Sequence, residues 1–119
     1  MFLWKSKKKE IRGVLKTIWV TNKSGHDFSP AEKFGRIEYL TEGVLPSKFS
    51  VNMLYRMFTE KMANAKQEDY ILMSGPSSAL SVAVAIMAAK HGIVNLLIHD
   101  TKDKRYEERS LVLERGERE

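Results

Sequence analysis

The stretch NKSGHDFSPAEKFG, residues 22–35, contains several side chains that could do chemistry within a few positions of one another. His26 offers a ring that can titrate near neutral pH, and Asp27 beside it offers a carboxylate. Both are candidates for general acid or base catalysis. A phosphorylated ligand could be held by the preceding residues Asn22, Lys23, Ser24 and Gly25. Adjacent side chains need not point the same way, so an exposed structural turn is the alternative interpretation.

The segment MSGPSSA, residues 73–79, is the second candidate, because it follows a predicted buried strand and opens a predicted helix. Gly75 permits a tight turn, and Ser77 and Ser78 add hydroxyls beside helix N–H groups that favour an anion. The segment lacks the lysine of a P-loop and the three-glycine spacing of a dinucleotide fingerprint. A phosphate site and simple helix capping are therefore both compatible with it.

Metal binding is a weaker possibility at the end of the predicted strand 93–99. His99 and Asp100 could join His26 and Asp27 as ligands, but the three histidines of the chain show no ligand spacing. We therefore predict no metal site and no cofactor. In RYEER, residues 105–109, cross-strand ion pairing is the simpler interpretation, and Arg109 binding a phosphate or a neighbouring subunit is the alternative.

The elements that must position these residues follow from hydrophobic patterning. We predict strands at 15–21, 36–41, 69–75, 93–99 and 105–113, and helices at 48–65 and 76–91. Within the opening loop, Ser29, Pro30 and Glu32 are typical of a capping box that starts one helical turn, which Gly35 would end. His91 lies in the last turn of the second helix, and Gly92 ends that helix.

The strand–helix–strand unit over residues 70–99 predicts a right-handed crossover between two parallel strands. The chain is therefore expected to be a small Rossmann-like α/β sandwich, with about five strands and two main helices. Its sheet would be mixed, parallel in the middle and antiparallel at one edge. If the first strand is parallel to the third, residues 22–27 would face residues 75–78 across a shallow cleft at the carboxyl ends of the strands.

The positive charge is concentrated in the first twelve residues. The net charge is +5, and residues 1–12 contribute +4 of it, from Lys5, Lys7, Lys8, Lys9 and Arg12 against Glu10. We expect residues 1–12 to be a flexible basic arm, which could bind nucleic acid, and residues 13–119 to be a single domain.

The composition limits the other classes of protein. The chain has no cysteine, which excludes disulfides and thiolate chemistry and is compatible with a reducing cytoplasm. Its longest apolar stretch, residues 79–89, is about half the ~20 residues of a membrane span, so we predict none. The predicted helix 76–91 has almost no polar face, and a homo-oligomer would help to cover it.

Several segments resemble, in the same order, those of a group of small proteins from tailed-phage and prophage genomes that have no assigned activity. They cover roughly residues 17–113 and are SGHDFSPAEKFG, YLTEG, NMLYRMF, DYILMSG, AAKHGIVNLLIHD and RYEERSLVL. The residues that match the group's pattern are His26, Asp27, Glu32, Gly35, Glu108 and Arg109. The resemblance implies a phage or prophage origin and a host-cytoplasm setting, and it supplies no catalytic residues.

Three classes of function are compatible with these residues. The first is binding of a nucleotide or other phosphorylated molecule in the predicted cleft, with sequestration of a host signalling nucleotide as one use. The second is a phosphodiester hydrolase in the same cleft, with His26 as general acid or base. The third is an oligomeric interaction or nucleic-acid-binding protein that acts through the basic arm. A purely structural role is a further alternative, and the sequence leaves open whether the protein is an enzyme.

Overall fold

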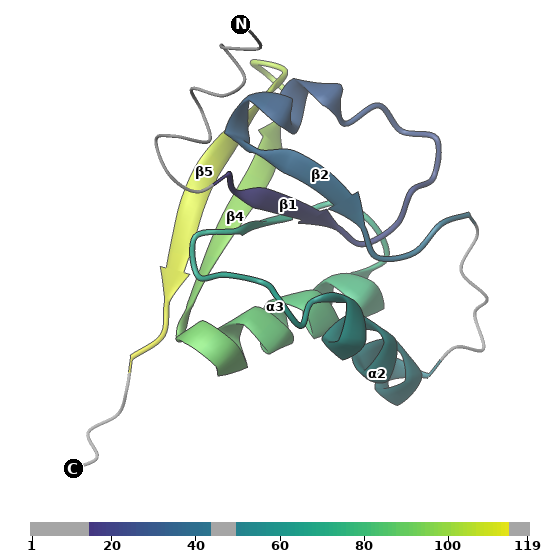
Figure 1. Cartoon of the computed structure of the whole chain (residues 1–119). Coiled ribbons are helices and arrows are strands. Elements are labelled where there is room, and N and C mark those ends of the chain that lie inside the picture. Colours follow the sequence, from purple (N-terminus) through teal and green to yellow (C-terminus); the bar gives the residue numbers. More distant parts are fainter. Residues whose placement is uncertain (1–14, 44–49, 115–119) are drawn as a thin grey trace, which may run out of the picture.

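The computed structural model describes residues 15–43 and 50–114, and these form one five-stranded sheet with helices on one face (Figure 1). The strand order is β2-β1-β3-β4-β5. The first four strands are parallel to their neighbours, and β5 is antiparallel to β4, as the sequence predicts. The strands are β1 (Thr17–Val20), β2 (Arg36–Tyr39), β3 (Tyr70–Leu72), β4 (Ile93–Asp100) and β5 (Arg105–Val112). The predicted basic arm lies outside the described residues.

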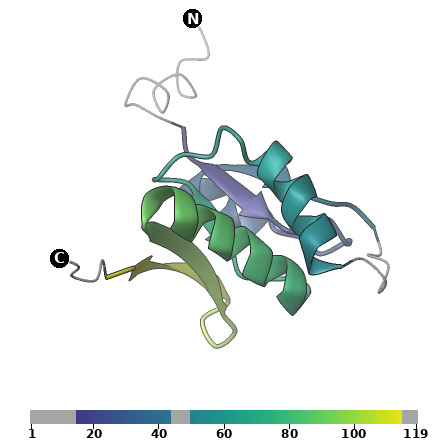
Figure 2. The ribbon, with the colours of Figure 1, turned by 90° about the horizontal axis from the view of Figure 1, so that it is seen from below.

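Two helices, α2 (Val51–Lys61) and α3 (Ser77–His91), lie next to each other on one face of the sheet, as the view in Figure 2 shows. α2 begins at Ser50, whose hydroxyl accepts a hydrogen bond from the Met53 N–H at 3.1 Å. α3 ends at Gly92, which has the left-handed conformation, with φ of 74°, that glycine adopts without strain. No helix in the described part of the chain is long and apolar enough to cross a membrane.

The helix-covered face of the sheet holds the larger apolar cluster. Trp19, Ile71 and Val94 from the strands pack here against both helices. The cluster's helix residues are Leu54, Phe58, Ala79, Val82, Ala83, Ile86 and Met87, and Met62 joins them from the position just after α2. Most of the apolar surface of α3 is thus covered within the chain, which leaves Ser81, Ala85 and Ala89 exposed on its outer side.

The opposite face of the sheet is covered by the loop 22–35. This loop contains a 3-10 helix, η1 (Ser29–Phe34), and it buries Phe28 and Ala31 against residues of β1, β3 and β4. The strand residues of this second cluster are Ile18, Val20, Tyr70, Leu72, Leu97 and Tyr106, the last of which lies on β5. The loop is therefore a structural layer that covers the face of the sheet opposite α2 and α3.

The capping box predicted for this loop is wrong. Ser29 is the first residue of η1, and Phe28, which stands at the cap position, makes no side-chain capping bond. Asp27 instead accepts a hydrogen bond from the Ser29 N–H at 3.0 Å, because an aspartate can satisfy the N–H two residues further on. The carboxylate predicted to face a ligand is thus hydrogen-bonded to the start of η1.

Element boundaries differ by a few residues from those predicted. α2 is shorter than the predicted helix 48–65, since the chain turns after Lys61 and the Lys90 ammonium binds the carbonyls of Met62 and Ala63 at 3.2 and 3.1 Å. Pro76 is the N-cap of α3 and not its first residue. β3 ends at Leu72 because the Ser74 N–H turns back to the Leu72 carbonyl at 2.9 Å.

Candidate functional site

The carboxyl ends of the parallel strands β1, β3 and β4 meet at one edge of the sheet, as predicted. Thr21 follows β1 and Ser74 follows β3, and the Thr21 hydroxyl donates a hydrogen bond to the Ser74 carbonyl at 3.1 Å. Gly75 has φ of 121°, and a Cβ atom there would overlap the Thr21 hydroxyl. Gly75 therefore allows the β3–α3 turn to approach the end of β1 closely.

A small hollow of about 210 Å³ lies at this edge, on the side of the sheet that η1 covers. It brings together the loop after β1, the turn after β3 and the hairpin of β4 and β5. Its lining residues are His26, Asp27, Pro30, Met73, Ser74, His99 and Tyr106. The predicted residues His26 and Asp27 thus share a site with His99, although these residues are far apart in the sequence.

His99 and Tyr106 form one wall of the small hollow. They are directly opposite each other in the β4–β5 ladder, and their ring centroids lie 5.1 Å apart in an edge-on arrangement. Burial, and secondly the Asp27 carboxylate, raise the pKa of Tyr106. The hydroxyl of Tyr106 is therefore kept protonated and can act as a hydrogen-bond donor at this wall.

His26 and Asp27 form the opposite wall, and each is held by a different neighbour. The hydrogen bonds from Ser29, together with a smaller contribution from His26, lower the pKa of Asp27. Asp27 is therefore an ionised acceptor and a poor proton donor. The His26 ring packs against Phe28 with centroids 5.3 Å apart. No hydrogen bond joins the two side chains in the described structure, so they do not form a dyad.

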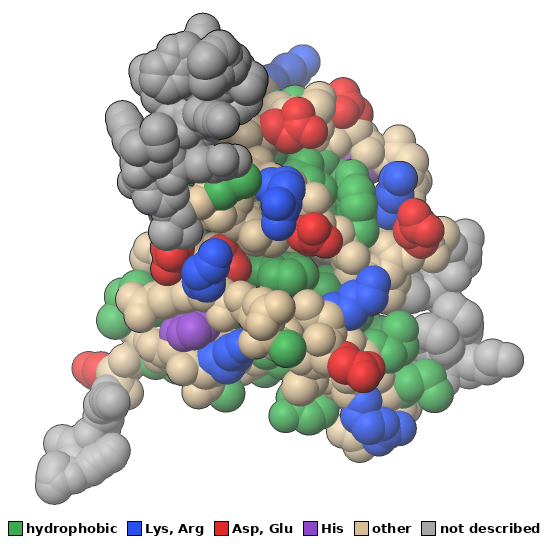
Figure 3. Space-filling model, viewed as in Figure 1, with side chains coloured by type: hydrophobic (Ala, Val, Ile, Leu, Met, Phe, Trp, Pro, Cys, Tyr) green, Lys and Arg blue, Asp and Glu red, His purple; other side chains and the backbone are tan. Residues whose placement is uncertain are grey.

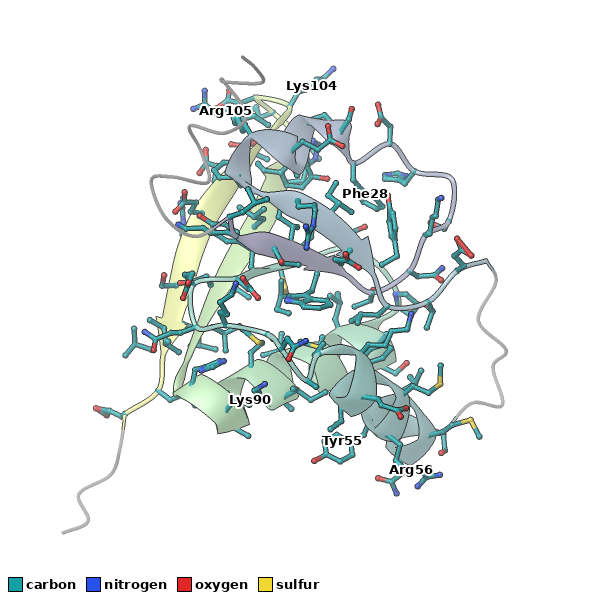
Figure 4. The ribbon with its side chains drawn as sticks, viewed as in Figure 1. Phe28, Tyr55, Arg56, Lys90, Lys104 and Arg105 are labelled. Carbon is teal, nitrogen blue, oxygen red and sulfur yellow. The ribbon has the colours of Figure 1, made fainter. Side chains whose placement is uncertain are left out.

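A second, larger hollow of about 440 Å³ lies over the edge strand β2 and was not predicted. His26 and Asp27 line this hollow as well, so the two hollows meet at these residues. The rest of its lining is Phe28, Ser29, Glu32, Gly35, Arg36, Ile37 and Tyr39. Phe28 points from its loop toward the strands (Figure 4), and its ring centroid lies 6.4 Å from that of Tyr39.

One basic side chain lines this larger hollow, and a second lies beside one of its aromatic rings. Arg36 belongs to its lining and is paired with Glu38 at 3.9 Å. The Lys23 ammonium lies 5.4 Å from the centroid of the Tyr39 ring and 3.9 Å from the Glu42 carboxylate. Basic, acidic and apolar side chains intermingle in the region of β2 (Figure 3). The larger hollow therefore combines aromatic rings with cations that are only loosely paired.

The other predicted site residues lie elsewhere. The Asn22 amide is engaged structurally, since it donates to the Gly43 carbonyl at 2.8 Å and accepts from the Thr41 hydroxyl at 2.7 Å. Arg109 lies on β5 and pairs with Glu107 at 2.8 Å. Ser24, Gly25, Gly75, Ser77 and Ser78 are exposed and belong to the lining of neither hollow. The small hollow thus lies between loop 22–35, residues 73–74 and the β4–β5 hairpin, and residues 75–78 are not part of its lining.

Potential metal ligands converge at a different place. In the described ranges, the ligand atoms that lie within 4.8 Å of one another belong to Asp100, Asp103 and Glu107, at the turn of the β4–β5 hairpin. Arg105 lies 3.7 Å from Asp103 and 3.8 Å from Glu107. Arg105 thus pairs with two of the three carboxylates, and the third, Asp100, accepts hydrogen bonds from the N–H groups of Lys102 and Asp103 at 3.0 and 3.3 Å, so we assign no metal to them.

Comparison with known proteins identifies a family. The family model described as Phage Pam3 gp32-like protein matches residues 16–113. Comparison with curated proteins and with solved structures gives no match. The chain therefore belongs to the Phage Pam3 gp32-like protein family, in agreement with the phage resemblance of its sequence.

Proposed function

We propose that this phage-family protein binds a phosphorylated small molecule with a planar ring, such as a nucleotide, in the two hollows that meet at His26 and Asp27. The observation that carries the proposal is that these two residues line both hollows. Together the two volumes fall within the range of about 300–1,000 Å³ that is usual for small-molecule sites.

The aromatic side chains favour the ring of such a ligand. Phe28, Tyr39 and His26 are neighbours over β2, with ring centroids separated by 6.4 Å and 5.3 Å from that of Phe28. Aromatic side chains bind planar rings by offset or edge-on packing. The larger hollow can therefore accept a nucleobase through ring packing.

The basic side chains favour the phosphate. Arg36 and Lys23 are each paired with a glutamate at 3.9 Å, and the paired side chains are largely exposed. Exposed pairs of this kind contribute only about 0–1 kcal/mol, so a ligand phosphate can replace the glutamate at little cost. A guanidinium group also matches phosphate geometry through two parallel hydrogen bonds. In the phage setting, such binding would sequester a host signalling nucleotide.

Native mass spectrometry of freshly purified protein is the first test, followed by isothermal titration calorimetry with a panel of nucleotides. Arg36→Ala is expected to weaken nucleotide binding at least about tenfold, because a charge-assisted hydrogen bond contributes roughly 1.5–3 kcal/mol. Arg56→Ala is the matched control, since Arg56 lies on the outer side of α2 (Figure 4). Equal affinity of both variants, or no binding by the wild type, would reject the proposal.

A phosphodiester hydrolase is the second candidate, because His26 and His99 both line the small hollow. Two imidazoles on one site can serve as general acid and general base. The required result is turnover of a labelled cyclic or linear nucleotide that is lost in both His26→Ala and His99→Ala. Nucleotide binding without turnover would leave the binding proposal standing alone.

A further inference from the structure

The outer edge of the sheet at β5 is open in the described structure. β5 is eight residues long and pairs with β4 on one side, and Figure 1 shows it (yellow) along one border of the sheet. The Leu113 N–H donates to the Gly92 carbonyl at 3.0 Å, so in this antiparallel ladder the odd-numbered residues direct their backbone groups toward β4. The outward N–H and C=O groups belong to Tyr106, Glu108, Ser110 and Val112.

The side chains at the end of this edge are unusually apolar for a free surface. Leu111 is 46% exposed, Val112 67% and Leu113 42%. Open edges of natural sheets are normally protected by charges, prolines, bulges or short length, because unpaired backbone groups accept any other strand. β5 carries charged side chains at 105 and 107–109, but its last residues lack such protection, which favours pairing of this edge with another strand.

The charges of β5 are complementary to those of a second copy of β5 that runs antiparallel to it. Glu107 and Arg109 share the helix-covered face, since their ladder partners are Ile98 and Leu96 and Leu96 packs in the cluster of that face. A second β5 that runs antiparallel about a two-fold axis at Glu108 places each Glu107 opposite the Arg109 of the other copy. Opposite charges directly across a pair of strands are favourable, and this register supplies two such pairs.

The same register accommodates other edge residues. Leu111 comes opposite Arg105 of the other copy, whose alkyl stem can cover it while the guanidinium stays in water. Ser110 comes opposite Tyr106 of the other copy, so the outward N–H and C=O groups of these two residues can hydrogen-bond to each other. From these observations we infer that a second copy of this chain adds its β5 to this edge, which would give a two-fold dimer with one continuous sheet of ten strands, five from each copy.

Two rearrangements accompany this pairing. The Arg109 guanidinium donates to the outward carbonyl of Glu108 at 2.7 Å and to the carboxylate of its own Glu107 at 2.8 Å, and it must move from both to the partner's Glu107. The two Glu108 side chains also come opposite each other on the η1-covered face. The two Glu107–Arg109 pairs must outweigh this repulsion.

Light scattering and sedimentation of charge variants test this dimer. The wild type is expected at twice the 13.7 kDa chain mass at micromolar concentration. Glu107→Arg and Arg109→Glu are each expected at the single chain mass, because like charges then face each other twice. A mixture of the two variants is expected to recover the double mass, since every pair across the interface is then opposite in charge. Glu60→Arg, on the exposed side of α2, is the control and stays dimeric.

A backbone test separates strand pairing from side-chain contacts. Ser110→Pro removes an outward N–H that the β4–β5 ladder does not use and that this register places opposite Tyr106 of the other copy, so the variant is expected to keep its circular dichroism spectrum and to become monomeric. A wild-type mass of one chain would overturn the inference. A dimer that survives Ser110→Pro or either charge reversal would also overturn it, since the copies would then be joined elsewhere. A variant mixture that stays monomeric would do the same.

Discussion

Trp19 on β1 donates its indole N–H to the carboxylate of Asp69, which lies at the start of β3, at 3.2 Å. Asp69 is 1% exposed, and it also accepts from the backbone N–H groups of Thr17 at 3.0 Å and Lys66 at 2.8 Å. Three donors therefore compensate a buried carboxylate that would otherwise be costly to remove from water. This single side chain joins two neighbouring strands to the turn after α2 and so fixes the start of the parallel sheet.

Asp69→Ala is expected to lower the free energy of unfolding by about 3 kcal/mol, because it leaves buried N–H groups unpaired. Asp69→Asn keeps one carbonyl acceptor and is expected to lose less. Urea denaturation monitored by Trp fluorescence measures both values. Glu60→Ala, an exposed carboxylate on α2, is the control. An equally small loss in Asp69→Ala and in the control would show that the three donors find water or other acceptors.

Tyr70 gives a prediction at alkaline pH. Burial, and secondly Glu108, raise the pKa of Tyr70 to about 12, whereas a tyrosine in the unfolded chain titrates near 10. The group thus contributes stability that is fully present below about pH 10 and is lost as the pH rises toward 12. In Tyr70→Phe this pH-dependent loss should shrink, which chemical denaturation at pH 9 to 11 can measure. An unchanged slope between pH 10 and 11 would contradict a buried, protonated Tyr70.

The sequence predicts those parts of the fold that depend on local pattern. The apolar run at β4, the glycine after α3 and the strand–helix–strand order are sufficient to predict a parallel centre with an antiparallel edge. These features need only periodicity and the right-handed crossover rule. The placement of residues 22–27 and 73–75 at one end of the sheet depended in addition on β1 running parallel to β3, which the structure confirms.

Which residues line the two hollows could not be predicted, because the lining depends on strand register and strand order. The register of the hairpin places Tyr106 opposite His99, and the turn residues 100–104 do not fix that register. The position of β2 at the sheet edge creates the larger hollow at Arg36 and Tyr39, and strand order is a tertiary property. Phe28 lies in the loop just before η1. Because η1 has only six residues, this segment is too short to show a periodic pattern that would predict the burial of Phe28.

The basic arm, residues 1–12, stays a prediction of the sequence. If it binds nucleic acid, affinity for a short DNA duplex should fall steeply with salt, with a slope of about −0.9 for each phosphate contact. Removal of residues 1–12 should abolish this binding and leave the thermal unfolding midpoint unchanged. Fluorescence anisotropy at several salt concentrations measures the slope. Binding that persists in the shortened chain would instead point to the described part of the protein.

Thr21 and Gly75 allow a test of the close approach that shapes the site edge. Gly75→Ala is expected to destabilise the fold by roughly 1–3 kcal/mol, because its Cβ overlaps the Thr21 hydroxyl and φ of 121° strains any L side chain. In the background of Thr21→Ala the overlap disappears while the backbone strain stays, so Gly75→Ala should cost less there. A double-mutant cycle by urea denaturation gives the difference. Equal costs in both backgrounds would attribute the whole effect to the backbone and would mean that the hydroxyl can move aside without loss of the hydrogen bond to Ser74.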